Sequence, residues 1–153
     1  MSLWTWWILY TLFAIWGQTI INGVDLFSPG LIVCLQDKKY KTALGLTICW
    51  MFIQEGTNVI AFGSEIIFFA CLWAIFFLGI TRFESENPLF VIFLSFVLTI
   101  CHTAIYWLMF GLQGIHFISG ITISACSKQF TVFIAVWGIT YLLYKRVITN
   151  DPI

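Results

Sequence analysis

Long apolar runs broken by short polar turns make up most of the chain. The clearest case is residues 59–111, in which two apolar runs of more than twenty residues flank the charged turn TRFESENP. A helix needs about 20 apolar residues to cross the hydrocarbon core of a bilayer. Both runs meet that requirement, so the pattern predicts a transmembrane helical hairpin around which the rest of the chain is organised.

The N-terminal half predicts one membrane helix and two shorter apolar segments. The first helix is expected at residues 3–22, where a tryptophan cluster suits an anchor at the bilayer interface. The second segment lies within residues 24–36 and starts its helix at Pro29, since proline fits the first helical turn. It would reach only about 15 Å, so it either spans a thin region or re-enters, shielded by protein. The third segment, residues 42–54, is also short and carries Gly45, whose small size would let a neighbouring helix approach closely.

The C-terminal third predicts an interfacial helix and a last membrane helix. Residues 112–129 mix apolar and polar positions, and part of this stretch is expected to lie along the membrane surface. Residues 130–144 form the last apolar run, closed by Lys145 and Arg146. The expected fold class is therefore an all-α integral membrane protein, a single polytopic domain over residues 1–153. It would have about six transmembrane or re-entrant helices, of which the second and third are short.

Composition supports a membrane location and argues against other classes. Of the 153 residues, 61% are hydrophobic and 9% are charged, whereas a soluble domain carries about 25% charged residues. The net charge is zero, which gives no electrostatic case for nucleic acid as a partner. The five cysteines form no CxxC pair and lie mostly inside apolar runs, so we interpret them as small core residues rather than as metal ligands or disulfides.

The distribution of basic residues predicts an orientation. With six segments, six of the seven cations fall on one side of the membrane and only Lys128 falls on the other. Lysine and arginine are enriched in cytoplasmic loops. We therefore expect a multi-pass protein of the bacterial inner membrane with both termini in the cytoplasm. The six cytoplasmic cations would be Lys38, Lys39, Lys41, Arg82, Lys145 and Arg146.

Two features inside the apolar runs are candidates for a functional role. Glu65 is the first, because a carboxylate within a membrane helix is costly to bury; it is either a structural polar contact or part of a site for a partner or ligand. The second is a polar face at helical spacing on the second helix of the hairpin. It consists of Ser95, Thr99, His102, Thr103 and Tyr106. We expect this face to pack against the helix of Glu65 and the segment of Gly45, either as interhelical glue or around a ligand- or proton-handling cavity.

No catalytic or cofactor site emerges from the motifs. The chain has no HExxH, no GxSxG and no glycine-rich phosphate loop, so we expect no enzyme activity, no cofactor and no metal site. His102 and His116 are the two histidines. They are expected at different depths, so one haem held by both is not predicted, whereas one histidine sharing a cofactor with another subunit stays open.

The layout of the segments resembles the rod-shape-determining protein MreD family along nearly the whole chain. The resemblance is carried by the motif FSPGLIVCL with Pro29, and by ALGLTICWMFIQEG, which Gly45 and Gly56 bracket. We expect Pro29, Gly45 and Gly56 to lie at contacts between packed helices. Where the family often has an aspartate in the third segment, this chain has Gln54 and Glu55. The resemblance implies a non-enzymatic subunit of the bacterial cell-wall elongation machinery, beside MreC-like and wall-synthase-like partners. It also implies a fold similar to the six-helix substrate-binding subunits of vitamin importers.

Three functions remain open at this point. The first is a structural scaffold subunit of a multi-protein membrane complex, as the resemblance implies. The second is the substrate-binding membrane subunit of a small-molecule transporter, because Glu65 and the polar face could frame a pocket. The third is the membrane anchor of a haem or quinone redox complex. His102 and the high aromatic content support this alternative.

Overall fold

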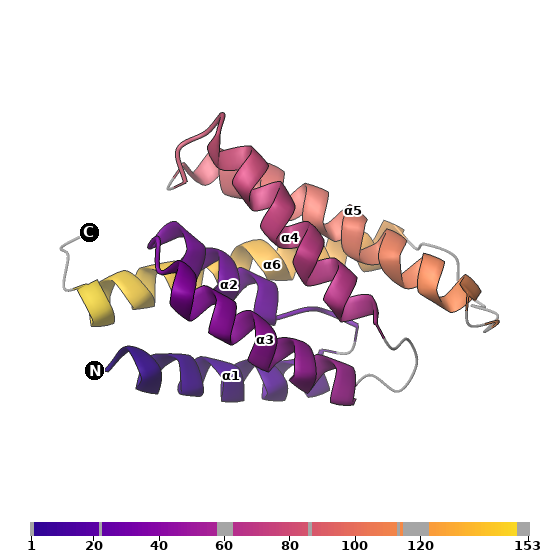
Figure 1. Ribbon diagram of the computed structural model, residues 1–153, viewed down its shortest axis with the longest axis horizontal. Helices are drawn as coiled ribbons and strands as arrows, with labels where there is room; N and C mark the ends of the chain where they lie inside the picture. The colour runs from indigo at the N-terminus through magenta and orange to yellow at the C-terminus, as the bar shows by residue number, and fades with distance from the viewer. Residues whose placement is uncertain are drawn as a thin grey trace.

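The chain folds into a bundle of helices. The computed structural model describes residues 2–21, 23–57, 63–85, 87–112, 114 and 123–149. All regular structure within these residues is helical, which confirms the expected all-α fold (Figure 1). The described helices are α1 (Leu3–Ile20), α2 (Phe27–Gln36), α3 (Tyr40–Thr57), α4 (Ser64–Ile80), α5 (Pro88–Leu112) and α6 (Ile123–Tyr144), the last followed by a π-helical turn (Lys145–Thr149).

Two of the described helices are long and apolar enough to cross a membrane by length and composition. These spans are Pro88–Met109 and Ile123–Ile148. The helices Phe27–Gln36 and Ser64–Ile80 are apolar but shorter. Two such helices agree with a membrane association, although fewer segments reach full spanning length than the sequence pattern predicts.

The short helix α2 lies at the centre of the bundle, where every one of its residues is buried. It packs mainly against α3 and α6, and α1 also touches it (Figure 1). Pro29 stands in its first turn, as the sequence predicts. A helix that is apolar all round is buried in protein on every side. The structure therefore supports the expectation that neighbouring helices shield this short segment.

The α4–α5 hairpin forms the other half of the bundle. The two helices pack side by side, with α3 against α4 and α6 against α5 (Figure 1). They approach closely at Gly79, where an added Cβ would lie 2.3 Å from the ring of Phe90. The predicted hairpin is present, with α4 described from Ser64 onward.

Aromatic side chains fill the core between α1, α2, α3 and the end of α6. The ring of Trp50 lies 5.2 Å from that of Phe27 and 5.7 Å from that of Tyr10. The ring of Trp7 lies 5.6 Å from that of Tyr144. Offset and edge-on aromatic pairs of this kind add stability beyond the area that they bury, so this cluster fixes α1 against the bundle.

Two predicted boundaries are wrong. The third segment is no short helix, because α3 has 18 residues, as many as α1. Lys41 and Glu55 are good helix formers and extend it beyond the predicted segment. The last helix begins at Ile123 rather than Phe130, so the end of the stretch expected to form an interfacial helix belongs to α6.

Candidate functional site

A buried aspartate starts the central helix. Asp25 is 2% exposed, and its carboxylate accepts hydrogen bonds from the backbone N–H groups of Phe27 at 2.8 Å and Ser28 at 3.3 Å. The first N–H groups of a helix have no partner within the helix, and a negative charge there is favoured by the helix dipole. Asp25 therefore caps α2 from inside the bundle.

Two glutamines from distant helices complete the surroundings of Asp25. The side-chain amide of Gln54, on α3, donates to Asp25 Oδ1 at 3.3 Å. Gln129, on α6, accepts from the backbone N–H of Asp25 at 2.9 Å and donates to its carbonyl oxygen at 3.3 Å. Both glutamines are less than 5% exposed. These bonds tie the entry of α2 to the helices on either side of it.

Glu65 lies at the start of α4 and is fully buried. Its carboxylate accepts a hydrogen bond of 2.5 Å from the hydroxyl of Tyr106 on α5. The carboxylate of Glu55, on α3, accepts from the backbone N–H groups of Gly63 at 2.9 Å and Glu65 at 3.1 Å. Glu55 thus caps α4 as Asp25 caps α2.

The two capped helix starts belong to one polar centre. The neighbouring residues Gln54 and Glu55 on α3 contact both starts, Gln54 at Asp25 and Glu55 at the backbone N–H groups that begin α4. The polar centre is defined here by the buried or half-buried side chains that surround these helix starts: Asp25, Gln54, Glu55, Glu65, Tyr106 and Gln129. Of these, Glu65 is a candidate site residue predicted from the sequence, and Tyr106 belongs to the predicted polar face.

The polar face of α5 looks into the bundle. Ser95 is fully buried and Thr99 is 4% exposed. The serine and threonine hydroxyls on this face donate to carbonyl oxygens of α5 itself, with Ser95 at 2.8 Å, Thr99 at 2.8 Å and Thr103 at 2.9 Å. Thr103 also lies 3.6 Å from the sulfur of Cys126 on α6. The hydroxyls are therefore satisfied locally.

The neighbours of this face differ in part from the expectation. α5 packs mainly against α4 and α6, whereas the main partners of α3 are α2 and α4. The ring of His102 lies 4.9 Å from that of Phe68 on α4 and 4.6 Å from that of Tyr106. The contact with α4 is thus as predicted, and α6 takes the place foreseen for the segment of Gly45. His116 lies outside the described residues.

Two of the three residues assigned to helix packing lie elsewhere. Gly45 and Gly56 are exposed, and a Cβ added to either would meet no described atom within 4 Å. Close approach occurs instead at Gly30, where a Cβ would lie 2.3 Å from the ring of Tyr10. A glycine does lie at a close helix contact, but it is Gly30 rather than Gly45 or Gly56. Pro29 remains where it was expected, inside the buried α2.

At the opposite end of α2, the α2–α3 loop, the α4–α5 turn and the π-helical turn after α6 lie on the same side of the bundle (Figure 1), and these segments with the start of α3 carry the basic residues. Lys39 forms an ion pair of 2.6 Å with Asp37 and donates to the hydroxyl of Tyr144 at 2.9 Å. The side chain of Gln36 donates to the carbonyl oxygen of Ser85 at 2.6 Å, which joins the end of α2 to the α4–α5 turn. The six cations expected on one side therefore do lie at one end of the bundle, here called the basic end.

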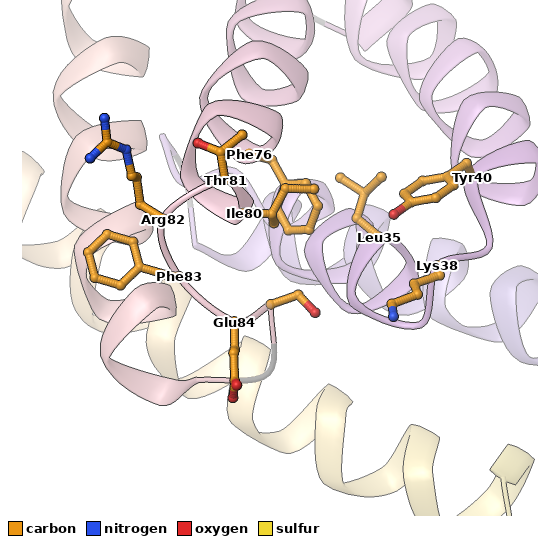
Figure 2. Close-up of a pocket in the computed structure, with 10 residues that line it drawn as sticks. Leu35, Lys38, Tyr40, Phe76, Ile80, Thr81, Arg82, Phe83 and Glu84 are labelled. Atoms are coloured by element: carbon orange, nitrogen blue, oxygen red, sulfur yellow. The ribbon is translucent and has the colours of Figure 1, made fainter.

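The basic end also holds a cavity of about 570 Å³ between the α2–α3 loop and the α4–α5 turn. Figure 2 shows Lys38 on one side of the Phe76 and Ile80 side chains, with Arg82 and Glu84 on the other. Phe76 is fully buried, whereas the three charged residues are exposed. The cavity thus has an apolar floor and a charged rim.

Comparison with family models, curated proteins and solved structures finds no match for this chain. Within the described residues, no group of three or more histidine, cysteine, aspartate or glutamate side chains is placed to hold a metal ion.

Proposed function

We propose that this chain is a multi-pass integral membrane protein. The observation that carries the proposal is the surface of the bundle, where large apolar side chains are exposed on α1, α3, α5 and α6. They include Trp16 at 74%, Phe52 at 69%, Leu89 at 70% and Ile123 at 86%. Soluble monomers rarely expose contiguous apolar patches of more than a few hundred Å². A bilayer is the solvent that suits such a surface while the polar side chains are kept inside.

The orientation follows from the basic end. Cytoplasmic loops carry an excess of lysine and arginine, so this end is assigned to the cytoplasm of a bacterial inner membrane, together with both termini. Lys128, the remaining cation, lies on α6 next to Gln129, which contacts Asp25 at the other end of α2. This distribution supports the expected topology.

Within the membrane we propose a non-enzymatic structural subunit of a multi-protein complex, similar to MreD of the cell-wall elongation machinery. The interior polar groups support this role, because Asp25 bonds to Gln54 and Gln129 and Tyr106 bonds to Glu65, each across two elements of the bundle. Such bonds hold helices together. The cell-shape assignment and the MreC-like and wall-synthase-like partners rest on the resemblance of layout described above.

Single-cysteine labelling in cells tests the topology. A cysteine at Lys41 is expected to react only after the membrane is permeabilised, and a cysteine at Ser124 is expected to react from outside. A reporter fused after Ile153 provides the matched check on the C-terminus. Labelling of Lys41→Cys in intact cells would contradict the orientation, and release of the chain by alkaline extraction would contradict membrane integration.

Affinity isolation from gently solubilised membranes tests the partners. Mass spectrometry is expected to identify an MreC-like protein and wall synthases with the tagged chain, in amounts well above those with an unrelated multi-pass protein. Depletion of the chain is expected to alter cell shape. Isolation without these proteins, together with normal shape after depletion, would remove the cell-wall assignment and leave the membrane assignment intact.

A second candidate function is the substrate-binding subunit of a small-molecule transporter. The cavity at the basic end favours it, because ligand pockets typically measure about 300–1,000 Å³ and combine an apolar lining with a few polar groups. A metabolite that co-purifies with the chain would support this alternative. The redox-anchor alternative rests on His102, and a Soret absorption band in the purified protein would be its signature.

A further inference from the structure

The exposed tryptophan and tyrosine side chains lie toward the two ends of the bundle. Among the side chains that the structure describes they are Trp4, Trp16, Tyr40 and Trp107, with exposed fractions from 39% for Tyr40 to 74% for Trp16. Trp4 and Tyr40 lie in the first turns of α1 and α3, which both start at the basic end, whereas Trp16 and Trp107 lie toward the far ends of α1 and α5 (Figure 1). Tryptophan and tyrosine are enriched at both membrane–water interfaces. These residues therefore mark two aromatic belts, one at each face of the membrane.

Helix α1 carries both belts and so measures the distance between them. Trp4 and Trp16 lie about 18 Å apart along the helix axis, at the rise of an α-helix. The large exposed side chains between them are all apolar, namely Ile8, Leu9, Leu12 and Phe13. The hydrocarbon core of an ordinary bilayer is about 30 Å thick. The apolar band of α1 is therefore thinner than such a core.

Helix α3 gives a second measure, from charged residues. Lys41 is exposed near its start and Glu55 is half-buried near its end, and about 21 Å of helix separates them. The Glu55 carboxylate is held in place, because it accepts hydrogen bonds from the backbone N–H groups of Gly63 and Glu65. A partly exposed carboxylate is costly in hydrocarbon. The far edge of the apolar layer therefore lies near Glu55.

The lengths of the helices agree with a thin apolar layer. α1, α3 and α4 have 18, 18 and 17 residues, which corresponds to about 25–27 Å even with their polar ends included. The two longer spans lie on α5 and α6. Figure 1 shows α5 inclined to α1, and a tilted helix covers less thickness than its length. The span on α6 includes the exposed Lys128, so its uncharged part is shorter than the helix.

We propose that the lipid-facing surface of this protein fits a bilayer thinner than usual, and that it prefers phospholipids with short acyl chains. A thicker bilayer would draw the belt residues and Glu55 into hydrocarbon, and a shorter lipid removes that mismatch. A second copy or a protein partner seated on the same faces gives no reason for exposed tryptophan and tyrosine to gather at the two ends. The inference rests on the membrane location proposed above and deepens it.

Competition with a brominated phosphatidylcholine measures the preference, because bromine quenches tryptophan fluorescence on contact. The purified full chain is reconstituted into mixtures of the brominated lipid with monounsaturated phosphatidylcholines of fourteen to twenty-two carbons per chain, whose hydrocarbon thickness grows with chain length. Relative affinity is expected to be highest at fourteen or sixteen carbons and about threefold lower at twenty-two. A maximum at eighteen carbons or more, or an affinity independent of chain length, would overturn the proposal.

A pair of variants moves the belt at Trp16 in opposite directions. Trp16→Leu/Thr19→Trp moves the tryptophan about one turn further from Trp4, and Phe13→Trp/Trp16→Leu moves it about one turn closer. All three positions are exposed. The preferred chain length is expected to increase in the first variant and to decrease in the second. The same preference in both variants would contradict Trp16 as a boundary of the apolar layer.

The outcomes separate this proposal from the membrane location on which it rests. Alkaline extraction of the chain from every vesicle would contradict the membrane location itself. A chain that stays in the vesicles and prefers long acyl chains would contradict only the thin layer. A chain that stays in the vesicles and is quenched by no brominated lipid would show that protein, such as a second copy, covers these faces, and the lipid proposal would fail.

Discussion

The hydroxyl of Tyr106 donates a hydrogen bond of 2.5 Å to the carboxylate of Glu65 and so joins α5 to α4 inside the bundle. Glu65 is fully buried, and its backbone N–H donates a hydrogen bond to the Glu55 carboxylate at the start of α4. A buried carboxylate is tolerated only when it is paired or hydrogen-bonded. The bond therefore explains how an acidic residue is accommodated in an otherwise apolar hairpin.

Removal of this bond is expected to destabilise the fold. Tyr106→Phe takes a donor away from a buried carboxylate, and leaving a buried polar group without its donor costs about 1–3 kcal/mol. Thermal unfolding in detergent measures the loss. The control is Tyr141→Phe, because Tyr141 is half-buried and stacks on Trp137 through its ring. Equal stability of the two variants would show that the hydroxyl of Tyr106 contributes nothing.

Glu65→Gln separates a structural role from a functional one. A neutral amide costs less to bury than a carboxylate and can still accept from Tyr106. If Glu65 is a structural contact, the variant is expected to match or slightly exceed the stability of the original chain and to keep its partners. Loss of the partners from a folded variant, measured by affinity isolation, would place Glu65 in a binding site.

Asp25 is expected to matter more than an ordinary helix cap. Asp25→Ala would leave N–H groups of α2 and the amide of Gln54 without their buried acceptor. Leaving a buried donor without its acceptor costs about 1–3 kcal/mol, whereas an exposed cap is worth about 1 kcal/mol. Asn87→Ala is the matched control, since Asn87 caps α5 at an exposed position through a bond of 2.9 Å to the N–H of Leu89.

The stabilities of Asp25→Ala and Asn87→Ala are compared under the same conditions. Unfolding of both is followed by circular dichroism, and hydrogen exchange is read at the amides of Phe27 and Ser28. Asp25→Asn, which keeps a side-chain oxygen, is expected to recover part of the stability. A loss at Asp25 no larger than the loss at Asn87 would contradict a buried network around the start of α2.

Local features of the sequence predict the elements well. Pro29 correctly marks the first turn of α2, and the charged turn between the long apolar runs correctly separates α4 from α5. The grouping of six cations at one end follows from the number of segments. Each of these inferences needs only residues close in the chain, where propensity and charge act directly.

Contacts between distant residues lie beyond such inference. Asp25 lies two positions after Gly23 in a sequence typical of a turn, yet its partner Gln129 is 104 positions away. The helix length of α3 was underestimated because polar residues at a helix end keep good helical propensity. Gly45 and Gly30 look alike in sequence, and only the packing of Tyr10 decides which glycine is close to a neighbour.

These two glycines give a matched pair of substitutions. Gly30→Ala would place a Cβ 2.3 Å from the ring of Tyr10, so we expect overpacking to cost about 1–3 kcal/mol. Gly45→Ala meets no described atom within 4 Å and replaces a glycine inside a helix, so we expect a gain of up to about 1 kcal/mol. Chemical denaturation in detergent measures both. A stabilising Gly30→Ala would show that α1 and α2 are not in close contact.

Thr99 tests the packing of the polar face on α5. The residue is 4% exposed, and its hydroxyl donates to the carbonyl oxygen of Ser95 at 2.8 Å. Thr99→Val removes only this local bond, so we expect a cost of about 1 kcal/mol or less. Thr99→Leu adds volume between α5 and its neighbours α4 and α6, and we expect overpacking of about 1–3 kcal/mol.

Thr131 provides the control for both changes. It lies exposed on α6, and its hydroxyl makes the same kind of bond, to the carbonyl oxygen of Ser127 at 2.9 Å. Thr131→Leu adds an apolar side chain to a surface that we assign to lipid, so we expect an effect within about 0.5 kcal/mol. Comparable losses from leucine at Thr99 and Thr131 would mean that Thr131 is also covered, by a partner or a second copy. A harmless leucine at Thr99 would contradict the packing of α5 against its neighbours, because only a loosely packed interior accepts the added volume.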